Sequence, residues 1–500
     1  MSLAQLNTRA QLGIEAPIVR VEVHIANGLP AFTVVGLPET AVREARDRVR
    51  SAIVNSGFEF PARRITVNLA PADLPKVGGR YDLAIALGIL GASAQVDLSS
   101  IQHCDCYGEL ALSGSLHRVA GLLPALVASQ QAGVSTIIPR QNKSEAELLR
   151  NSPTRLAASL IQVCASLNGG QPLGKVEHDQ FDLDYNDTLD LLDVQAQYAA
   201  KRALEIAAAG GHHMLMMGPP GTGKSMLAQR LNSILPPLSE QEAMHTASIR
   251  SLCHRPVNAQ NWRQRPYQAP HHSVSDVALV GGGSLPRPGE ISLAHNGVLF
   301  LDELTEFNRR AIEVLREPLE AGSIHISRAA GQAIFPAQFQ LVTALNPCPG
   351  GCESVRQCDC SPESVRRYRG KLSAPLLDRI DIQIELHRLP SRDLLSSRRN
   401  GDSSAQIRTR VCQARERQLR RQGCINAQLD AKTTEQYCAL NRKCQQLMQL
   451  SIDRLGLSAR SFHKVLKLSR SIADLADCDA IDSTHLAEAI SLRTCDRLNY

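Results

Sequence analysis

A glycine-rich motif that suits phosphate binding lies near the middle of the chain. It fits the pattern G-x-x-x-x-G-K-[ST] without a mismatch and consists of Gly218, Pro219, Pro220, Gly221, Thr222, Gly223, Lys224 and Ser225. Glycines allow backbone N–H groups to close on phosphate oxygens at a helix N-terminus, where the helix dipole favours anions. Lys224 would reach the β- and γ-phosphates, and Ser225 would ligate Mg²⁺. The motif therefore predicts a site for ATP and Mg²⁺.

Two carboxylates after an apolar run could complete this site. Val298–Leu301 is followed directly by Asp302 and Glu303. Asp302 could hold the Mg²⁺ ion, and Glu303 could orient and polarise the attacking water. An apolar run that ends in Asp-Glu is common in α/β proteins, so its pairing with the phosphate loop is what makes it specific.

Three more residues suit phosphoryl transfer, although each taken alone could be an ordinary surface residue. Asn346 follows the expected strand Leu341–Leu345 and could hold the attacking water or the γ-phosphate. Arg379 follows one expected helix, and Arg460 opens another. An arginine supplied to the γ-phosphate can raise the rate by about 10³–10⁵.

An α/β core is expected to position these residues. Met214–Met217 is the expected strand before the phosphate loop, and Met226–Leu235 is the expected helix after it. Between residues 195 and 388, strand and helix patterns alternate with glycine-rich turns, which is typical of an α/β domain. Ser323–Ser327 and Ala333–Pro336 are expected to form a β-hairpin.

The regions on either side of this core have different patterns. Residues 1–172 have strand patterns at Val19–Ile25 and Ile65–Leu69 and a helix pattern at Glu39–Ser56, which predicts an α+β domain. Residues 173–194 are expected to be an acidic linker. Residues 389–500 are expected to be helical, over Arg408–Gln422, Thr433–Leu455, Ser458–Leu475 and Ser483–Leu492.

Composition limits the compartment and the partners. No secretory signal opens the chain, and the apolar run Leu83–Ala92 is about half as long as a membrane span, so we expect a buried helix there. The fourteen cysteines are then reduced thiols or metal ligands in a cytoplasmic protein with no membrane partner. The net charge is +6, and the arginine-rich region 391–421 could bind DNA, although a solvated helix face explains it equally well.

The order of these motifs resembles that of AAA+ ATPases, in which a P-loop core is followed by a helical lid. The segments that resemble the magnesium-chelatase-like branch are Arg265–His272, Gly281–Gly283, Arg287–Glu290 and Leu315–Glu320. The resemblance extends over essentially the whole chain to the bacterial YifB/ComM family. It implies a homohexameric ring with ATP at the subunit interfaces. It also implies that Asn346 is sensor 1, that Arg379 is an arginine finger acting on the neighbouring subunit, and that Arg460 is sensor 2.

Residues 1–172 resemble the proteolytic domain of Lon, which has a ribosomal S5 domain 2-like fold. Gly108–Leu116 and the following Ala120-Gly121-Leu122 carry this resemblance. Arg80 stands where Lon has its nucleophilic serine, and Leu123 stands where Lon has its catalytic lysine. Because a Ser–Lys pair needs both partners, we expect a non-catalytic domain.

A cysteine cluster in the loop 347–361 could bind zinc. The spacing C-x₃-C-x₅-C-x-C allows four thiolates to complete a tetrahedral Zn²⁺ site, and the cluster consists of Cys348, Cys352, Cys358 and Cys360. Four free thiols are the alternative. The family often has cysteines here, commonly as C-P-C, but some members lack them, so zinc would be structural. The pairs His212-His213 and His271-His272 are expected to be structural or to support site residues.

The family resemblance also indicates a function. In related ring ATPases, the hairpin that holds Arg328 and the insert near Arg287 project into the central pore. These arginines could hold phosphates of single-stranded, double-stranded or branched DNA without reading bases, although the hairpin could instead pack on its own subunit. The family includes a branch-migration helicase used in natural transformation, which implies an ATP-dependent helicase of homologous recombination, with recombination proteins as partners. The alternative is an ATP-dependent protein remodeller or a magnesium-chelatase-type motor subunit.

Overall fold

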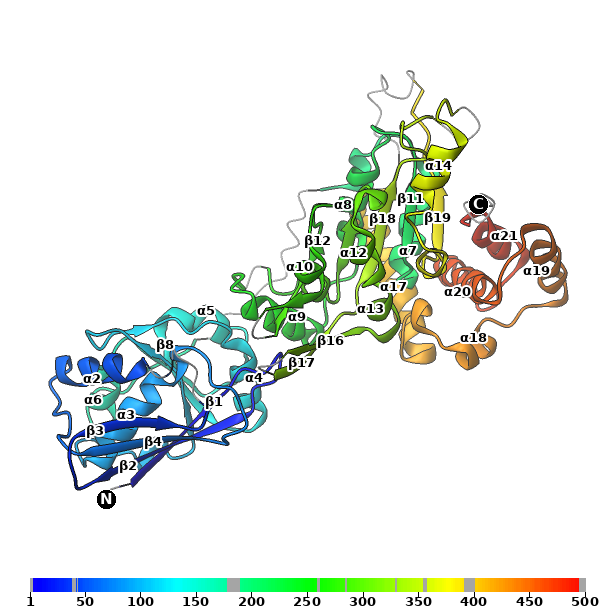
Figure 1. Ribbon diagram of the computed structural model, residues 1–500. Helices are drawn as coiled ribbons and strands as arrows, with labels where there is room; N and C mark the ends of the chain where they lie inside the picture. Colours follow the sequence, from blue (N-terminus) through cyan, green and yellow to red (C-terminus); the bar gives the residue numbers. More distant parts are fainter. Residues whose placement is uncertain are drawn as a thin grey trace.

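The chain forms an N-terminal domain, a parallel-sheet domain and a set of C-terminal helices (Figure 1). The computed structural model describes residues 3–37, 42, 44–177, 189–258, 261–283, 286–328, 331–353, 358–390 and 401–493. Within these ranges, no helix combines the length and the apolar character needed to cross a membrane.

The N-terminal domain is built on a mixed eight-stranded sheet in the order β10-β9-β8-β5-β1-β2-β4-β3. The predicted strands at Val19–Ile25 and Ile65–Leu69 are confirmed as β2 and β4, which pair antiparallel. Buried and more exposed residues alternate along both strands, because one face of the sheet covers the domain core. The strands are β1 Leu3–Arg9, β2 Ile18–Ala26, β3 Ala31–Val35, β4 Arg64–Ala70, β5 Cys104–Cys106, β8 Ser135–Pro139, β9 Thr154–Ala157 and β10 Gly174–Lys175, with a separate pair β6 Glu109–Leu110 and β7 Leu116–His117.

Helices cover this sheet. The apolar run Leu83–Ala92 is confirmed as a buried helix, α3, which packs on β1 and β2. The helix expected over Glu39–Ser56 is α2; residues 39–41 and 43 lie outside the described ranges. The helices are α2 Ala45–Asn55, α3 Asp82–Ala92, α4 Leu123–Gln131, α5 Lys143–Ala146 and α6 Leu160–Leu167.

The second domain has a five-stranded, all-parallel sheet in the order β12-β15-β18-β11-β19. The expected strands Met214–Met217 and Leu341–Leu345 are confirmed as β11 and β18, and the apolar run Val298–Leu301 is also a strand, β15. The strands are β11 Met214–Met217, β12 Tyr267–Gln268, β15 Val298–Leu301, β18 Gln340–Leu345 and β19 Ile382–Glu385. Alternate side chains enter two apolar cores: Met214 and Met216 enter one, and Leu215 and Met217 enter the other. Both faces of the sheet are therefore covered, as expected for an α/β domain.

Short helices and two β-hairpins surround this sheet. The predicted hairpin is confirmed as β16 Ser323–Arg328 paired with β17 Gly331–Pro336, and a smaller hairpin joins β13 Gly281–Gly282 to β14 Arg287–Pro288. The helices are α7 Tyr198–Gly210, α8 Lys224–Ile234, α9 Glu240–Leu252, α10 Asp276–Val280, α11 Glu290–Leu293, α12 Arg309–Glu313, α13 Arg316–Ala321, α14 Pro362–Arg369 and α15 Ala374–Leu377.

The C-terminal helices share an apolar core with α7, α8 and one face of the parallel sheet. They are α17 Ser404–Gln422, α18 Ala431–Tyr437, α19 Arg442–Leu455, α20 Ala459–Leu475 and α21 Ser483–Ser491. The prediction of one helix over Thr433–Leu455 is wrong, because the chain forms α18 and α19 there instead. The Asn441 side chain accepts a hydrogen bond from the Cys444 N–H and begins a new helix, which a periodicity argument does not detect.

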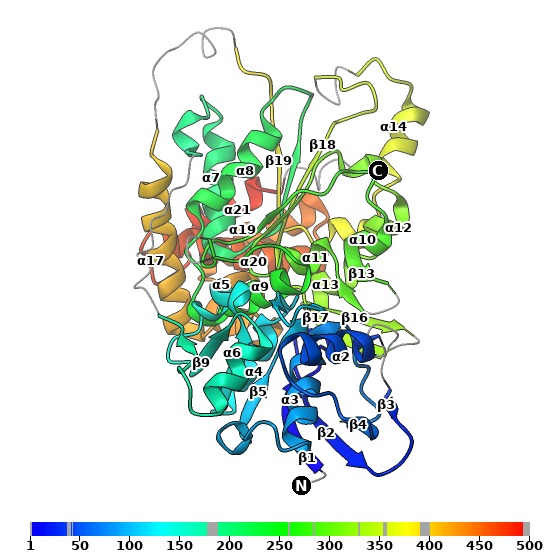
Figure 2. The ribbon, with the colours of Figure 1, turned by 90° about the vertical axis from the view of Figure 1, so that its left-hand side faces the viewer.

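A buried apolar cluster joins the N-terminal domain to the second domain. Leu122, Leu123 and Leu126 pack there together with Ala247 and Trp262. Helices α4 and α9 are in contact at this junction, and both lie near the boundary between the two domains in Figure 2. A continuous core across the boundary means that these two domains are packed against each other rather than joined only by a linker.

Candidate nucleotide site

The phosphate loop connects β11 to α8. β11 is fully buried, and the helix begins at Lys224, two residues before the predicted start at Met226. Gly221 and Gly223 have left-handed backbones with φ of 82° and 86°, a region that suits glycine. The loop therefore closes tightly and directs the N-terminus of α8 toward the place where phosphates would bind.

Lys224 lies inside this loop. Its Nζ donates to Gly218 O at 2.6 Å, to Pro219 O at 3.0 Å and to Asn346 Oδ1 at 3.1 Å. Burial lowers the pKa of Lys224, and the carboxylates of Asp302 and Glu303 oppose that shift. β18, which ends just before Asn346, is the direct neighbour of β11 in the sheet, and this pairing brings Asn346 to Lys224.

The predicted Mg²⁺ ligands are also in contact. Ser225 Oγ donates to Asp302 Oδ2 at 2.5 Å, which joins the first turn of α8 to the end of β15. A hydroxyl and a carboxylate are ligands that Mg²⁺ accepts in phosphate-binding sites, so this pair fits the ion. Loop residue Thr222 donates from Oγ1 to Pro219 O at 2.9 Å and so stabilises the turn internally.

Glu303 has an unusual backbone at the open side of the site. Its φ is 50°, a left-handed value that is costly for a residue with a side chain. Its N–H donates to Asp302 Oδ1 at 3.0 Å, and its carboxylate is about half exposed. His272 Nδ1 lies 3.9 Å from Glu303 Oε2. The ring centroids of His271 and His272 are 4.0 Å apart, with the two rings tilted by 35°. A contact of His272 with Glu303 agrees with a supporting role for this histidine.

Among the described residues, neither of the two predicted arginines forms a hydrogen bond or an ion pair with the phosphate loop. Arg460 is exposed in the first turn of α20. Arg379 lies after α15, where its Nη1 donates to Pro375 O at 2.5 Å and its Nη2 forms an ion pair with Glu320. The sequence indicated Arg379 but not Glu320, because the two residues are far apart along the chain and no local motif links them.

A buried ion pair fixes the chain just beyond Arg379. Asp381 accepts from Lys464 Nζ of α20 at 2.8 Å and from the His213 N–H at 3.1 Å. Although burial opposes ionisation, Lys464 and the neighbouring histidines hold the pKa of Asp381 well below its ordinary value. The helix that holds Arg460 is thereby attached to the segment that holds Arg379. This attachment was not predicted from sequence.

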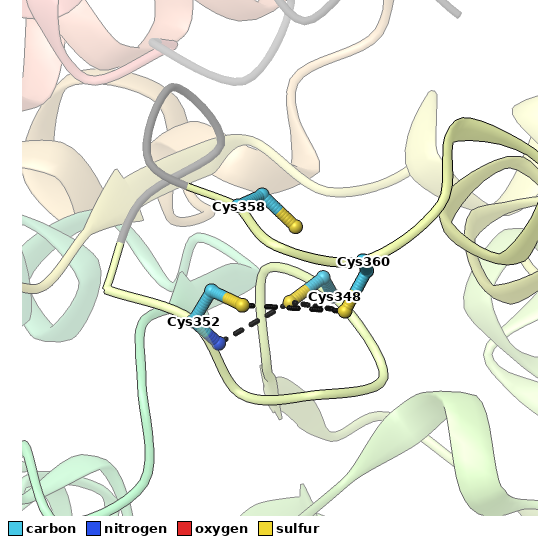
Figure 3. A group of neighbouring side chains, drawn as sticks. All are labelled: Cys348, Cys352, Cys358 and Cys360. Carbon is cyan, nitrogen blue, oxygen red and sulfur yellow. Dashed lines mark hydrogen bonds between the residues drawn. The ribbon is translucent and has the colours of Figure 1, made fainter.

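The four predicted cysteines converge on one point (Figure 3). Their sulfur atoms lie within 4.8 Å of one another, with Cys348 and Cys360 at 3.6 Å and Cys352 and Cys360 at 4.0 Å. Four sulfurs held tetrahedrally at about 2.3 Å from Zn²⁺ would be about 3.8 Å apart, so the cluster has the right size. Although burial favours the thiol, hydrogen bonds from Cys352 and the other thiols lower the pKa of Cys348 to about 7.

The two candidate DNA-binding arginines are both exposed and lie on adjacent hairpins. Arg287 belongs to β14, where it pairs with Gly282, and Arg328 ends β16. The Arg328 guanidinium lies about 3.2 Å from the position that a Cβ atom on Gly282 would occupy. The other strand of the larger hairpin packs inward, since Phe335 is buried and Ala333 lies against Gly13 of the N-terminal domain. The hairpin thus packs on its own chain while Arg328 remains accessible.

The fold and the site define a nucleotide-binding protein of the P-loop class, with a parallel sheet and a Mg²⁺-type hydroxyl–carboxylate pair. Residues 190–394 match the family described as "Magnesium chelatase, subunit ChlI", residues 21–142 match "Subunit ChlI of Mg-chelatase", and residues 401–493 match its C-terminal part. The chain belongs to the magnesium-chelatase-like ComM/YifB family of AAA+ proteins.

The similar proteins match over very different lengths. Competence protein ComM of Haemophilus influenzae is 50% identical over 502 residues, which cover 100% of this chain and 99% of that protein. Uncharacterized protein YifB of Escherichia coli is 48% identical over 498 residues, covering 100% and 98%. The Magnesium-chelatase 67 kDa subunit of Heliobacterium mobile is 27% identical over 193 residues, covering 33% of this chain and 29% of that subunit.

Proposed function

We propose that this chain is an ATP-driven, homohexameric DNA motor that promotes branch migration during homologous recombination, as in natural transformation. The observation that carries the proposal is the 50% identity along the whole chain with Competence protein ComM, which includes both regions that flank the nucleotide site. We also propose a cytoplasmic location, because ATP and DNA, the proposed ligands, are both found there.

ATP hydrolysis is assigned to the residues that meet between α8, β15 and β18. Ser225 and Asp302 would hold Mg²⁺, which when bound offsets the negative charge of the phosphates. Lys224 exchanges its contacts with Gly218 and Pro219 for the β- and γ-phosphates. The exposed Glu303 carboxylate orients the attacking water, and Asn346, already bound to Lys224, positions the γ-phosphate or that water.

Arg379 is proposed to act on the ATP of a neighbouring subunit. Within the described residues of the single chain its polar partners are Glu320 and Pro375 O rather than the phosphate loop, which supports a role at another copy. Hydrolysis then depends on assembly, and each ATP cycle can move one subunit against the next. Arg460, exposed at the start of α20, is proposed to sense the nucleotide from the helical lid.

DNA is proposed to bind at the neighbouring hairpins through Arg287 and Arg328. Two exposed arginines on adjacent hairpins can bind backbone phosphates of DNA, and such contacts do not depend on base sequence. This suits a motor that must pass over any sequence, and recombination proteins are the expected partners. The N-terminal domain is proposed to be Lon-like but non-proteolytic, and the cysteine cluster is proposed to hold a structural Zn²⁺ ion.

The test uses purified full-length protein, ATP and a synthetic four-way junction, with Lys224→Ala as the inactive control. We expect the wild-type protein to convert the junction to duplex products and to show DNA-stimulated ATP hydrolysis. Retained ATP hydrolysis without junction conversion or DNA stimulation would contradict the helicase and favour a protein remodeller or a magnesium-chelatase-type motor. The 33% coverage of this chain by the magnesium-chelatase subunit gives that alternative less support.

A further inference from the structure

A cavity of about 210 Å³ lies where the N-terminal domain meets the two hairpins. Gln11 and Arg80 line it from the N-terminal domain, and His254, Arg287 and Ala333 line it from the second domain. In Figure 2 the hairpin β16–β17 lies directly beside the N-terminal domain at this junction. The cavity is distinct from the nucleotide site, since no residue of the phosphate loop lines it.

Arg80 is the unusual residue of this cavity. It is only 5% exposed, and its Nη2 donates to Gln11 Oε1 at 2.8 Å and to Ala120 O at 2.9 Å. Both acceptors are neutral, and no carboxylate within the described ranges forms an ion pair with this arginine. A buried cation without a counter-charge is unfavourable unless another group neutralises it.

Two other buried arginines among the described residues, Arg9 and Arg470, each have a carboxylate partner. Arg9 pairs with Asp105 at 2.8 Å, and Arg470 pairs with Asp474 at 3.0 Å. Arg80 differs from both in that it lines a cavity, together with the two residues that accept hydrogen bonds from its guanidinium group, Gln11 and Ala120. Glu109 lines the same cavity but forms no ion pair with Arg80 among the described residues, so an anion that enters the cavity can pair with this arginine directly.

The remaining polar groups indicate what kind of anion fits. Arg287, which belongs to β14, and His254 also line the cavity. Guanidinium groups bind phosphate oxygens well because their N–H groups match the spacing of two oxygens. Glu109 also lines the cavity, so a ligand that presents a hydroxyl beside its phosphate would give this carboxylate a donor.

We propose that this junction cavity binds a phosphate group, either one of a DNA strand held at the hairpins or that of a free nucleotide. Its volume is below the about 300–1,000 Å³ typical of pockets for drug-sized ligands, so a single phosphate with its sugar suits it. The residue that stands in place of the Lon nucleophile then has a binding role. This proposal concerns phosphate binding alone and does not depend on the helicase activity.

The test measures phosphate binding calorimetrically on the full chain with the phosphate loop filled by Mg²⁺–ADP. The probes are inorganic phosphate, dAMP, and one oligodeoxynucleotide with and without a 5′-phosphate. We expect Arg80→Gln and Arg287→Gln each to weaken binding of a phosphate probe by about ten-fold or more, since each removes charge-assisted hydrogen bonds. Arg63→Gln, an exposed change in the same domain, is the matched control and should bind as the wild type does.

The outcomes separate the two sources of phosphate. If the oligonucleotide with the 5′-phosphate binds more tightly than the one without it, and Arg80→Gln abolishes this difference, the site is assigned to DNA. If inorganic phosphate or dAMP binds and the two oligonucleotides bind equally, the site is assigned to a free anion. Because a change at the buried Arg80 could disturb packing, thermal unfolding is compared among the variants. Arg287 is exposed, so phosphate binding by Arg287→Gln tests the site without that effect on packing. Absence of phosphate binding with the loop filled, or binding that neither variant weakens, overturns the proposal.

Discussion

Neutralising Glu320 is expected to raise ATP turnover in the absence of DNA. In the single chain, the Arg379 guanidinium is held by Glu320 and by Pro375 O, so it must leave these partners before it can reach another subunit. The backbone beyond it is fixed by the buried pair of Asp381 and Lys464. Glu320→Gln therefore changes how strongly the side chain is held and leaves its place in the chain unaltered.

The magnitude follows from the exposure of the pair. The side chain of Arg379 is 14% exposed and that of Glu320 is 58% exposed, so solvent screens their attraction. Pairs of this kind contribute about 0.2–1 kcal/mol, which at about 1.4 kcal/mol per ten-fold corresponds to about a 1.4- to 5-fold change in the released population. We expect the DNA-free turnover number of Glu320→Gln rings to rise within that range, and the rise to shrink as salt is added.

The assay is steady-state ATP hydrolysis over a range of protein concentrations that reaches those at which the proposed ring would assemble, with and without DNA. Glu317→Gln is the matched control, because Glu317 is an exposed carboxylate on the same helix, α13. Arg379→Ala should remove the activity in either background. Turnover of Glu320→Gln that equals or falls below that of the wild type, while Glu317→Gln is unchanged, would refute the reasoning.

Other outcomes concern stability and metal content. Lys464→Met should lower the free energy of unfolding by about 3–5 kcal/mol in urea titrations, because it removes the lysine that forms the buried ion pair with Asp381, and adding Asp381→Asn should recover part of the loss. Burial lowers the pKa of His295 to about 4, so only the unfolded chain is protonated between about pH 6.5 and pH 4. The free energy of unfolding should hence be insensitive to this group above pH 6.5, and the contribution of His295 should fall by up to about 3 kcal/mol as pH decreases to 4. His295→Gln should remove this share of the slope and leave the share of His213, whose pKa burial also lowers to about 4. Metal analysis in reducing buffer should find one zinc ion per chain in the wild-type protein. The Cys352→Ser variant should lose this zinc and largely retain ATP turnover. Absence of zinc from the wild-type protein would exclude the metal site.

The residues around the phosphate loop could be predicted because their geometry is set locally. The strand before the loop, the glycines and the first turn of α8 are consecutive in sequence, and each has a physical reason for its residue type. The contact of Asn346 with Lys224 could also be anticipated, since neighbouring parallel strands end at the same edge of a sheet. The hydroxyl–carboxylate pair of Ser225 and Asp302 follows from the same topology.

The contacts that sequence reasoning missed depend on residues distant along the chain. The partner of Arg379 is Glu320, and the partner of Asp381 is Lys464 in a helix of the C-terminal region. Neither pair has a spacing rule, so neither could be deduced from motif patterns. The break between α18 and α19 was missed for a different reason: helical periodicity continues across it, and only the cap at Asn441 marks it.

The apolar junction between the N-terminal domain and α9 has a practical consequence for work on either part. Removing the first 172 residues would uncover Leu238, Ala247 and Trp262, which the full chain keeps from water. The shortened chain would expose an apolar surface, and exposed apolar surfaces of this kind promote self-association. A loss of activity after truncation would then reflect aggregation rather than a missing contribution to catalysis. Substitutions in the full-length chain are therefore the better way to assign functions to its domains.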